Sequence, residues 1–186
     1  MVELSCGLPP GPNFSDMAVL AESLGYSRIW IFDSAPLWED PFVHLALAAN
    51  RTSRIGLGSA VLIPDERSEM SMASAIATIV RLSHGRFRAC FGTGATARRT
   101  MGQRPLKLRK LTDYVTAVRG LLAGDTVTID GQSARMLHAK GLALSRPIEV
   151  EIWLSVFGPR GLRIAAELAD GIIAGSPTEL PLPLPC

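Results

Sequence analysis

The fold is indicated by the stretch Arg28-Ile29-Trp30-Ile31-Phe32-Asp33-Ser34, an apolar run of strand length that ends in two polar residues. The run lacks the alternation of polar and apolar residues that marks a strand with one solvated face, so it predicts a strand buried on both sides. A helix is expected after it at residues 41–50, with Asp40 placed to cap its first turn. A buried strand followed by a helix is the building unit of a parallel sheet.

The same unit recurs along the chain. Ser15 is expected to cap the first helix and Gly25 to end it. The repeat is interrupted at residues 124–144, where an alternating segment, an Asp130-Gly131 turn and a return strand within 134–144 predict an inserted hairpin. The other predicted strands are 2–8, 54–61, 87–91, 149–156 and 171–174, and the other helices 14–24, 69–83, 104–122 and 159–169.

Two α/β architectures satisfy this pattern, a doubly wound sheet and a β/α (TIM) barrel. The barrel is favoured because small or polar residues stand at the carboxyl ends of the strands, where barrels carry their active sites. Gly92-Thr93-Gly94 lacks the third glycine of a dinucleotide fingerprint. Since a complete barrel needs eight strands and about 250 residues, we predict a barrel domain at 1–176 that is truncated after about the sixth strand, and an irregular Pro/Leu-rich tail at 177–186.

Composition narrows the function classes. The chain of 186 residues is 47% hydrophobic and 19% charged, which is a globular composition, and its net charge of +2 gives no support to nucleic-acid binding. Three cysteines without metal-ligand spacing predict no disulfide and suit a reducing cytoplasm. No segment reaches the roughly twenty apolar residues of a membrane span, so a soluble, cytoplasmic protein with no membrane partner is expected.

Several short motifs together resemble the luciferase-like monooxygenase superfamily, which includes bacterial luciferase, flavin monooxygenases and coenzyme F420-dependent oxidoreductases. Each motif is weak alone, but their order and spacing match across nearly all of residues 1–176. They are Ala21-Glu22-Ser23-Leu24-Gly25-Tyr26, Trp30-Ile31-Phe32-Asp33, Asp40-Pro41-Phe42-Val43, Arg51-Thr52-Ser53-Arg54-Ile55-Gly56-Leu57-Gly58, Leu82-Ser83-His84-Gly85-Arg86-Phe87 and Gly158-Pro159-Arg160-Gly161-Leu162.

The resemblance implies a β/α barrel with a flavin or deazaflavin across the carboxyl ends of its strands, a small-molecule substrate and a homodimer. It places a non-proline cis peptide at Ser59-Ala60, behind the ring. Two departures stand out. F420-using relatives commonly carry a histidine where this chain has Ser34, and many relatives carry Arg-His-Pro where Arg67 is followed by Ser68 and Glu69.

The candidate site residues fall into three groups, and no metal ligands are among them. Asp33 is the catalytic candidate, although capping of the following loop is an equally ordinary role for it. The residues expected around the cofactor ring are Ser34, Ser59, Ala60, Gly92, Thr93 and Gly94. The residues expected to bind its phosphate at a helix N-terminus are Ser155, Val156, Phe157, Gly158, Pro159 and Arg160, with a plain strand–helix turn as the alternative.

The predicted function is that of a flavin- or deazaflavin-dependent oxidoreductase, with hydride transfer to or from coenzyme F420 favoured. The alternatives are an FMN-dependent monooxygenase and a truncated, non-catalytic homologue that binds cofactor or dimerises. An apolar face on the helix at 69–83 predicts core packing first and a subunit interface second. Its residues are Met70, Met72, Ile76, Ile79 and Val80.

Overall fold

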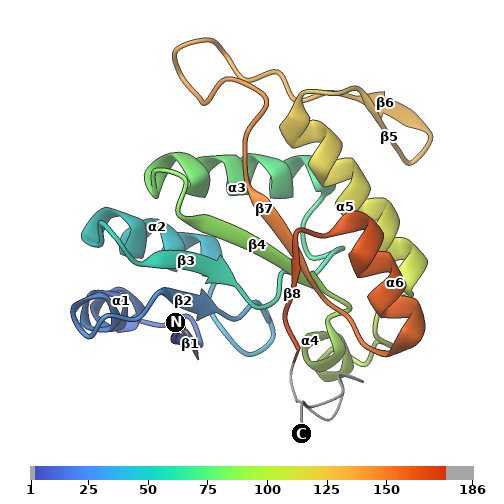
Figure 1. Ribbon diagram of the computed structural model, residues 1–186. Coiled ribbons are helices and arrows are strands. Elements are labelled where there is room, and N and C mark those ends of the chain that lie inside the picture. The colour runs from blue at the N-terminus through green and yellow to red at the C-terminus, as the bar shows by residue number, and fades with distance from the viewer. Residues whose placement is uncertain (1–2, 175–186) are drawn as a thin grey trace, which may run out of the picture.

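A curved parallel sheet of six strands organises the computed structural model, which describes residues 3–174 (Figure 1). The strands lie in the order β1-β2-β3-β4-β7-β8, so each is added beside its predecessor as in a barrel, and the doubly wound alternative is wrong. The predicted tail at 177–186 lies outside the described residues. The strands are β1 (Ser5–Leu8), β2 (Arg28–Ile31), β3 (Gly56–Ser59), β4 (Phe87–Gly92), β7 (Glu151–Ser155) and β8 (Gly171–Ile172).

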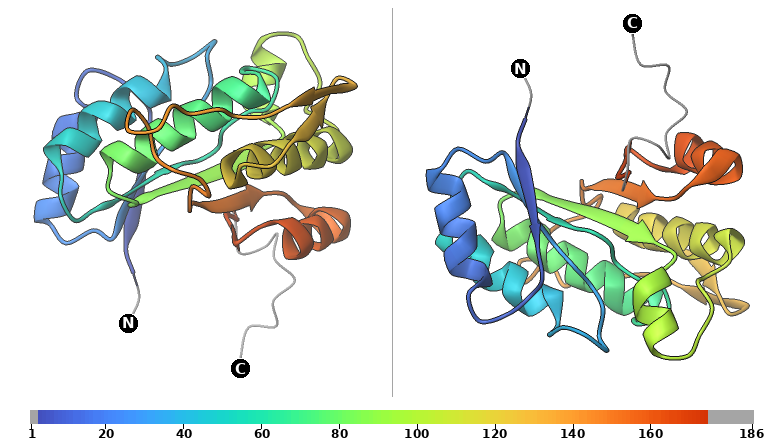
Figure 2. Two further views of the ribbon diagram at one scale, coloured as in Figure 1. Left: turned by 90° about the horizontal axis from the view of Figure 1, so that it is seen from above. Right: turned by 90° about the horizontal axis from the view of Figure 1, so that it is seen from below.

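Helices connect these strands along one side of the curved sheet (Figure 2). A small antiparallel hairpin of β5 (Val127–Ile129) and β6 (Gln132–Ala134) extends from the end of α5 (Figure 1). No described helix has the length and apolar character needed to span a membrane. The helices are α1 (Phe14–Ser23), α2 (Pro41–Arg51), α3 (Glu69–Leu82), α4 (Ala95–Thr100), α5 (Leu108–Ala123) and α6 (Gly158–Leu168).

The core lies between the sheet and its helices. Ile29 and Ile31 of β2 are fully buried, whereas the alternating Arg28 and Trp30 are only partly covered on the inner face of the sheet. The apolar face of α3 is buried in the core, with Met72 and Ile76 inaccessible to solvent and Met70 partly buried against them. Core packing is therefore the role of this face.

Several boundaries differ from the sequence prediction for local reasons. Ser15 lies inside α1, whose N-cap Asn13 makes no side-chain cap, and Ser15 Oγ instead accepts a hydrogen bond from Arg51. The short helix α4 was not predicted, because its six residues follow a strand end without an apolar stripe. The return strand of the hairpin is Gln132–Ala134, immediately after the turn, and not a longer segment of 134–144.

Other local signals are confirmed. The Asp40 carboxylate accepts a hydrogen bond from Phe42 N and caps α2 as expected. Asp130 and Gly131 both have positive φ, as a two-residue hairpin turn requires. Gly85 ends the region of α3 with a φ of 79°, and its N–H donates to Val80 O.

Two charged side chains connect the segments at the beginning of the strands. The Arg86 guanidinium donates to carbonyl oxygens of Ala49, Thr52, Ile55 and Ser83 and to the Thr52 hydroxyl. The Glu22 carboxylate accepts the backbone N–H groups of residues 53, 54 and 55 at 3.0, 2.6 and 2.8 Å. Burial alone would raise the pKa of Glu22, but these amide donors outweigh it and the pKa is lowered.

We expect Arg86→Met to lower the free energy of unfolding by about 3 kcal/mol, because it leaves several part-buried carbonyl groups without a donor. Denaturant unfolding measures the loss. Arg81→Met is the matched control, since Arg81 is an exposed arginine in the last turn of α3. This control variant should change the free energy of unfolding by less than about 0.5 kcal/mol. Equal losses in the two variants would contradict the role of Arg86.

Glu22→Gln should make the free energy of unfolding less dependent on pH in the acid range. The pKa of Glu22 is lower in the folded than in the unfolded chain, so the carboxylate stabilises the fold above its unfolded pKa of about 4.3. That contribution is lost as pH falls through the folded-state value. Unfolding measured at several pH values should show a weaker acid dependence for Glu22→Gln than for the exposed control Glu167→Gln.

Candidate functional site

The carboxyl ends of β2, β3, β4 and β7 surround a cavity of about 340 Å³. This volume lies within the range of small-molecule sites. Parallel strands present these ends at one edge of the sheet, which is where barrels bind ligands. Eight of the predicted site residues line the cavity: Asp33, Ser34, Ala60, Gly92, Thr93, Gly94, Ser155 and Phe157.

The remaining predicted residues lie elsewhere. Ser59 is fully buried, and its hydroxyl bonds to the backbone of Cys90, so it connects β3 and β4. Val156 is packed in the core. Gly158, Pro159 and Arg160 form the exposed first turn of α6, beyond the cavity wall, with proline in the first turn as predicted.

Two glycines allow the cavity wall to pack closely. A side chain at Gly92 would place its Cβ 2.6 Å from Val61 Cγ2, and one at Gly94, where φ is 67°, would lie 2.6 Å from Ile63 Cγ2. The backbone of β4 therefore passes directly against the loop after β3. The non-proline cis peptide lies in this loop between Ala60 and Val61, one bond later than the predicted Ser59-Ala60.

Among residues 3–174, Asp33 is the one charged residue in the cavity wall. Its side chain is only 1% exposed, and Oδ2 lies 2.8 Å from Arg67 Nη1, while Oδ1 has no hydrogen-bond partner among the described residues. Burial raises the pKa of Asp33 above its usual value, and the charge of Arg67 opposes part of that rise. Ser34 Oγ is likewise buried without a partner in the described chain.

Arg67 links three segments around Asp33. Its Nη2 lies 2.7 Å from Asp40 Oδ2, and its guanidinium stacks 5.1 Å from the centre of the Phe42 ring. Burial would raise the pKa of Asp40, but Arg67 and the capped amides outweigh it and the pKa is lowered. The hydroxyl of Tyr114, from α5, donates to Arg67 O at 2.7 Å. The position of Asp33 is therefore fixed from outside the cavity.

The rim of the cavity is apolar. Leu37 and Trp38, from the loop after β2, are 45% and 42% exposed, and Phe157, from the loop after β7, is 52% exposed. Small backbone-lined walls with an aromatic rim suit a flat ring, and Oδ1 of Asp33 and Oγ of Ser34 offer it polar contacts. In the described chain, no group of three or more His, Cys, Asp or Glu side chains is arranged to bind a metal.

The most important residue missed from the sequence is Arg67. It stands 34 positions after Asp33, on a different loop, and nothing local marks an arginine as the partner of a distant carboxylate. Trp38 and Leu37 were missed for a similar reason, because exposed apolar residues in a loop carry no periodic signal. The sequence predicted that Asp40 caps α2, but it did not indicate that the same carboxylate pairs with Arg67.

A parallel half-barrel with a cavity at the carboxyl ends of its strands defines the class of the chain, that of the β/α-barrel proteins. The family comparison narrows the class further, since residues 5–181 match the model of the luciferase-like monooxygenases. The chain belongs to this family.

Curated relatives agree with that assignment. The chain is 33% identical over 170 residues to a 5,10-methylenetetrahydromethanopterin reductase of Methanolobus tindarius, covering 88% of this chain and 50% of the relative. It is 30% identical over 185 residues to an F420-dependent glucose-6-phosphate dehydrogenase of Nakamurella multipartita, covering 89% and 53%. The chain thus spans about half the length of these relatives.

Solved structures share the fold. The F420-dependent tetrahydromethanopterin reductase of Methanopyrus kandleri superposes with a TM-score of 0.75 at 23% identity, over 93% of this chain and 55% of that one. The oxygenating constituent of 3,6-diketocamphane monooxygenase from Pseudomonas putida, in complex with FMN, gives 0.70 at 17% identity, over 89% and 56%. The six strands correspond to part of a luciferase-like TIM barrel, which confirms the predicted fold.

Arg67→Met should lower the free energy of unfolding by about 3–5 kcal/mol at neutral pH, because it leaves a buried carboxylate without its counter-charge. The loss should shrink at pH 4. A buried Asp whose folded pKa is raised keeps its proton in the fold, so the cost of ionisation grows only as pH rises above the unfolded pKa of about 3.9. Urea unfolding at both pH values measures this difference.

Two further variants separate the ion pair from general damage. Arg67→Met combined with Asp33→Asn should recover part of the lost stability, because the buried charge of Asp33 is removed together with its counter-charge. Arg51→Met removes an ion pair whose partners are 48% and 55% exposed and should cost less than about 1 kcal/mol. The role of Arg67 would be refuted if the double variant were no more stable than Arg67→Met alone.

Proposed function

We propose that this chain is a flavin- or deazaflavin-binding oxidoreductase that uses coenzyme F420 at the cavity between the carboxyl ends of its strands. The observation that carries the proposal is the convergence of eight predicted residues, from four strands and the loops after them, on one cavity. The F420-dependent glucose-6-phosphate dehydrogenase at 30% identity favours the deazaflavin. FMN is the second candidate, because a structural neighbour with the same fold holds it.

The residues present fit a tricyclic ring. Ala60, Gly92 and Gly94 line the cavity with little or no side chain, and Trp38 and Phe157 can cover the apolar faces of the ring from two sides. The two polar atoms without partners, Asp33 Oδ1 and Ser34 Oγ, stand side by side in sequence and can accept from an N–H and donate to a C=O of the ring edge. When bound, the deazaflavin supplies hydride transfer chemistry.

The side chains would bind, orient and exclude water. Asp33, held by Arg67 through Oδ2, keeps Oδ1 as a fixed acceptor toward the ring or substrate. Ser34 stands where F420-using relatives commonly carry a histidine, so proton transfer at this position would fall to another group. Asp33 has a pKa raised by burial, which moves it toward the range of a general acid or base.

We also propose that the phosphate of the cofactor binds at the first turn of α6. Gly158 and Arg160, on either side of Pro159, carry backbone N–H groups at the start of an 11-residue helix, whose dipole favours an anion there. The turn follows Ser155 and Phe157, which line the cavity. If the ring of the cofactor lay in the cavity, the phosphate-bearing side chain of the cofactor would therefore run toward the exposed start of α6.

The first test is a titration of the purified protein with F420 and with FMN, followed by fluorescence. Saturable binding of F420, tighter than that of FMN, is the expected result, and tighter FMN binding would select the second candidate. Binding of neither would overturn the proposal and favour a non-catalytic homologue. Since Trp38 lines the cavity, its fluorescence reports binding without any need for turnover.

Thr93→Phe should weaken cofactor binding by at least tenfold, because the larger side chain fills part of the cavity that Thr93 lines. Thr128→Phe is the matched control, since Thr128 lies in the hairpin strand β5 and is exposed. The control should bind as the unaltered protein does. If both variants bound F420 equally well, the cofactor would have to lie elsewhere.

A further inference from the structure

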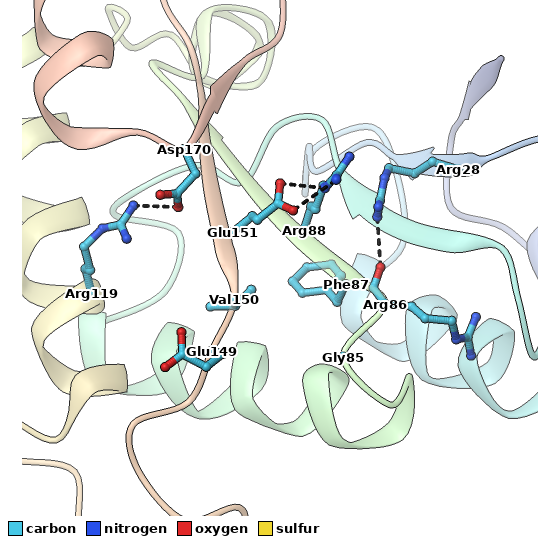
Figure 3. A pocket seen from close by; sticks show the side chains of 10 residues that line it. All are labelled: Arg28, Gly85, Arg86, Phe87, Arg88, Arg119, Glu149, Val150, Glu151 and Asp170. Atoms are coloured by element: carbon cyan, nitrogen blue, oxygen red, sulfur yellow. Dashed lines mark hydrogen bonds and ion pairs between the residues drawn. The ribbon is translucent and has the colours of Figure 1, made fainter. Parts of the chain in front are cut away.

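A second cavity, of about 360 Å³, lies at the opposite end of the sheet, where the strands begin (Figure 3). Four arginines contribute to its lining, together with three carboxylates. It shares no lining residue with the cavity at the carboxyl ends of the strands. The proposed cofactor site therefore does not account for it.

Two of the carboxylates are already neutralised. Glu151 forms an ion pair with Arg88, with 2.7 Å between Oε2 and Nε. Asp170 pairs with Arg119 at 2.9 Å and also accepts the backbone N–H of Ile152 at 2.7 Å. The third, Glu149, is an exposed residue. Each of these two carboxylates is bound directly to an arginine other than Arg28.

Arg28 has no such counter-charge. Within residues 3–174 its guanidinium forms no ion pair, and its two hydrogen bonds, 2.6 Å to Leu57 O and 2.9 Å to Arg86 O, both come from Nη1. The Nε and Nη2 groups make no hydrogen bond within these residues and are available to a ligand. Figure 3 shows the Arg28 and Arg88 side chains converging on one region of the cavity.

Aromatic stacking holds these two guanidiniums in place. Arg28 lies 5.5 Å from the centre of the Trp30 ring and Arg88 lies 5.0 Å from that of Trp153. The two tryptophan rings contact each other, with centroids 5.7 Å apart. The two positive groups are thus supported by one continuous aromatic pair on the inner face of the sheet.

The glycine at position 56 makes room for this arrangement. A Cβ at Gly56 would lie 2.5 Å from Arg28 Cζ, so the guanidinium rests flat against the backbone of β3. Both β2 and β3 therefore fix the position of the Arg28 guanidinium, which is not a flexible surface group. A donor fixed in this way loses little conformational entropy when it binds a ligand.

The electrostatics favour an anion. Burial, followed by the nearby charge of Arg88, lowers the pKa of Arg28 to about 10, although the charges of Glu151 and Glu3 oppose part of that shift. A negative group hydrogen-bonded to Arg28 would offset both the repulsion from Arg88 and the cost of burying Arg28 without an ion-pair partner. A planar carboxylate or a phosphate matches the parallel donors of a guanidinium edge.

We propose that this cavity is a binding site for a small oxyanion, in which Arg28 donates from Nε and Nη2 to a phosphate or carboxylate group beside the Arg88–Glu151 ion pair. Inorganic phosphate and malonate represent the two possible sources of the oxyanion. The cavity volume limits the ligand to a small molecule. The site is independent of cofactor binding at the other end of the strands.

The test uses the protein's own tryptophans. The chain has three, Trp30, Trp38 and Trp153, so a Trp38→Phe background leaves only the pair that supports the two arginines. Phosphate and malonate are titrated at constant ionic strength, with sodium chloride as the balancing salt, because general screening would otherwise mimic binding. A saturable fluorescence change with either anion supports the proposal and identifies the oxyanion class.

Variants of Arg28 make the test specific. Arg28→Lys keeps the charge but removes the planar fork and should weaken binding at least fivefold, while Arg28→Met should abolish it. Arg51→Met removes an arginine from the helical side and should leave the affinity unchanged. Circular dichroism checks that each variant is folded. If Arg28→Met is unfolded, the affinity of Arg28→Lys is compared with that of the unaltered protein, and this comparison decides the test.

Two results would overturn the proposal. One is the absence of any saturable change with phosphate or malonate in the Trp38→Phe protein. The other is a change that a folded Arg28 variant retains at full affinity. Neither outcome bears on F420 or FMN binding, which is measured at a separate cavity.

Discussion

The hydrogen bonds of Arg86 are the constraint on which the beginning of the sheet depends. One guanidinium satisfies carbonyl oxygens at the end of α2, in the loop before β3 and at the end of α3. These carbonyls belong to helix ends and to a crossing loop, where backbone groups have few other partners. Burial lowers the pKa of Arg86, yet arginine keeps its charge under all ordinary conditions. The Arg86 guanidinium therefore donates these hydrogen bonds at every ordinary pH.

This constraint explains why three of the family motifs lie far from the proposed site. Thr52 and Ile55 belong to one motif and Ser83 and Arg86 to another, and the structure joins them to each other. Glu22, from a third motif, holds the loop at residues 53–55. These motifs identify the fold because they close the amino-terminal ends of the strands, which in barrels is the end associated with stability. The ligand-binding end is left to the loops.

The sequence predicted the fold well because its signals are local. Each strand is a short apolar run, and Asp40 and Gly85 mark a helix start and a helix end through chemistry within a few residues. The cavity was predicted in outline for the same reason, since parallel strands place their carboxyl ends together. Its details were not, because the Asp33–Arg67 pair and the cis peptide after Ala60 depend on loops brought together only by the complete sheet.

The alternation of side chains along β2 connects the two cavities. Ile29 and Ile31 face the core, which leaves Arg28 and Trp30 on the inner face and places Asp33 just beyond the carboxyl end. A shift of one residue in the register with β3 would bury Arg28 and expose the isoleucines. The hydrophobic cost of that shift fixes the register. The apolar residues of a single strand thereby set the positions of a positive group at one end of the sheet and of a buried carboxylate at the other.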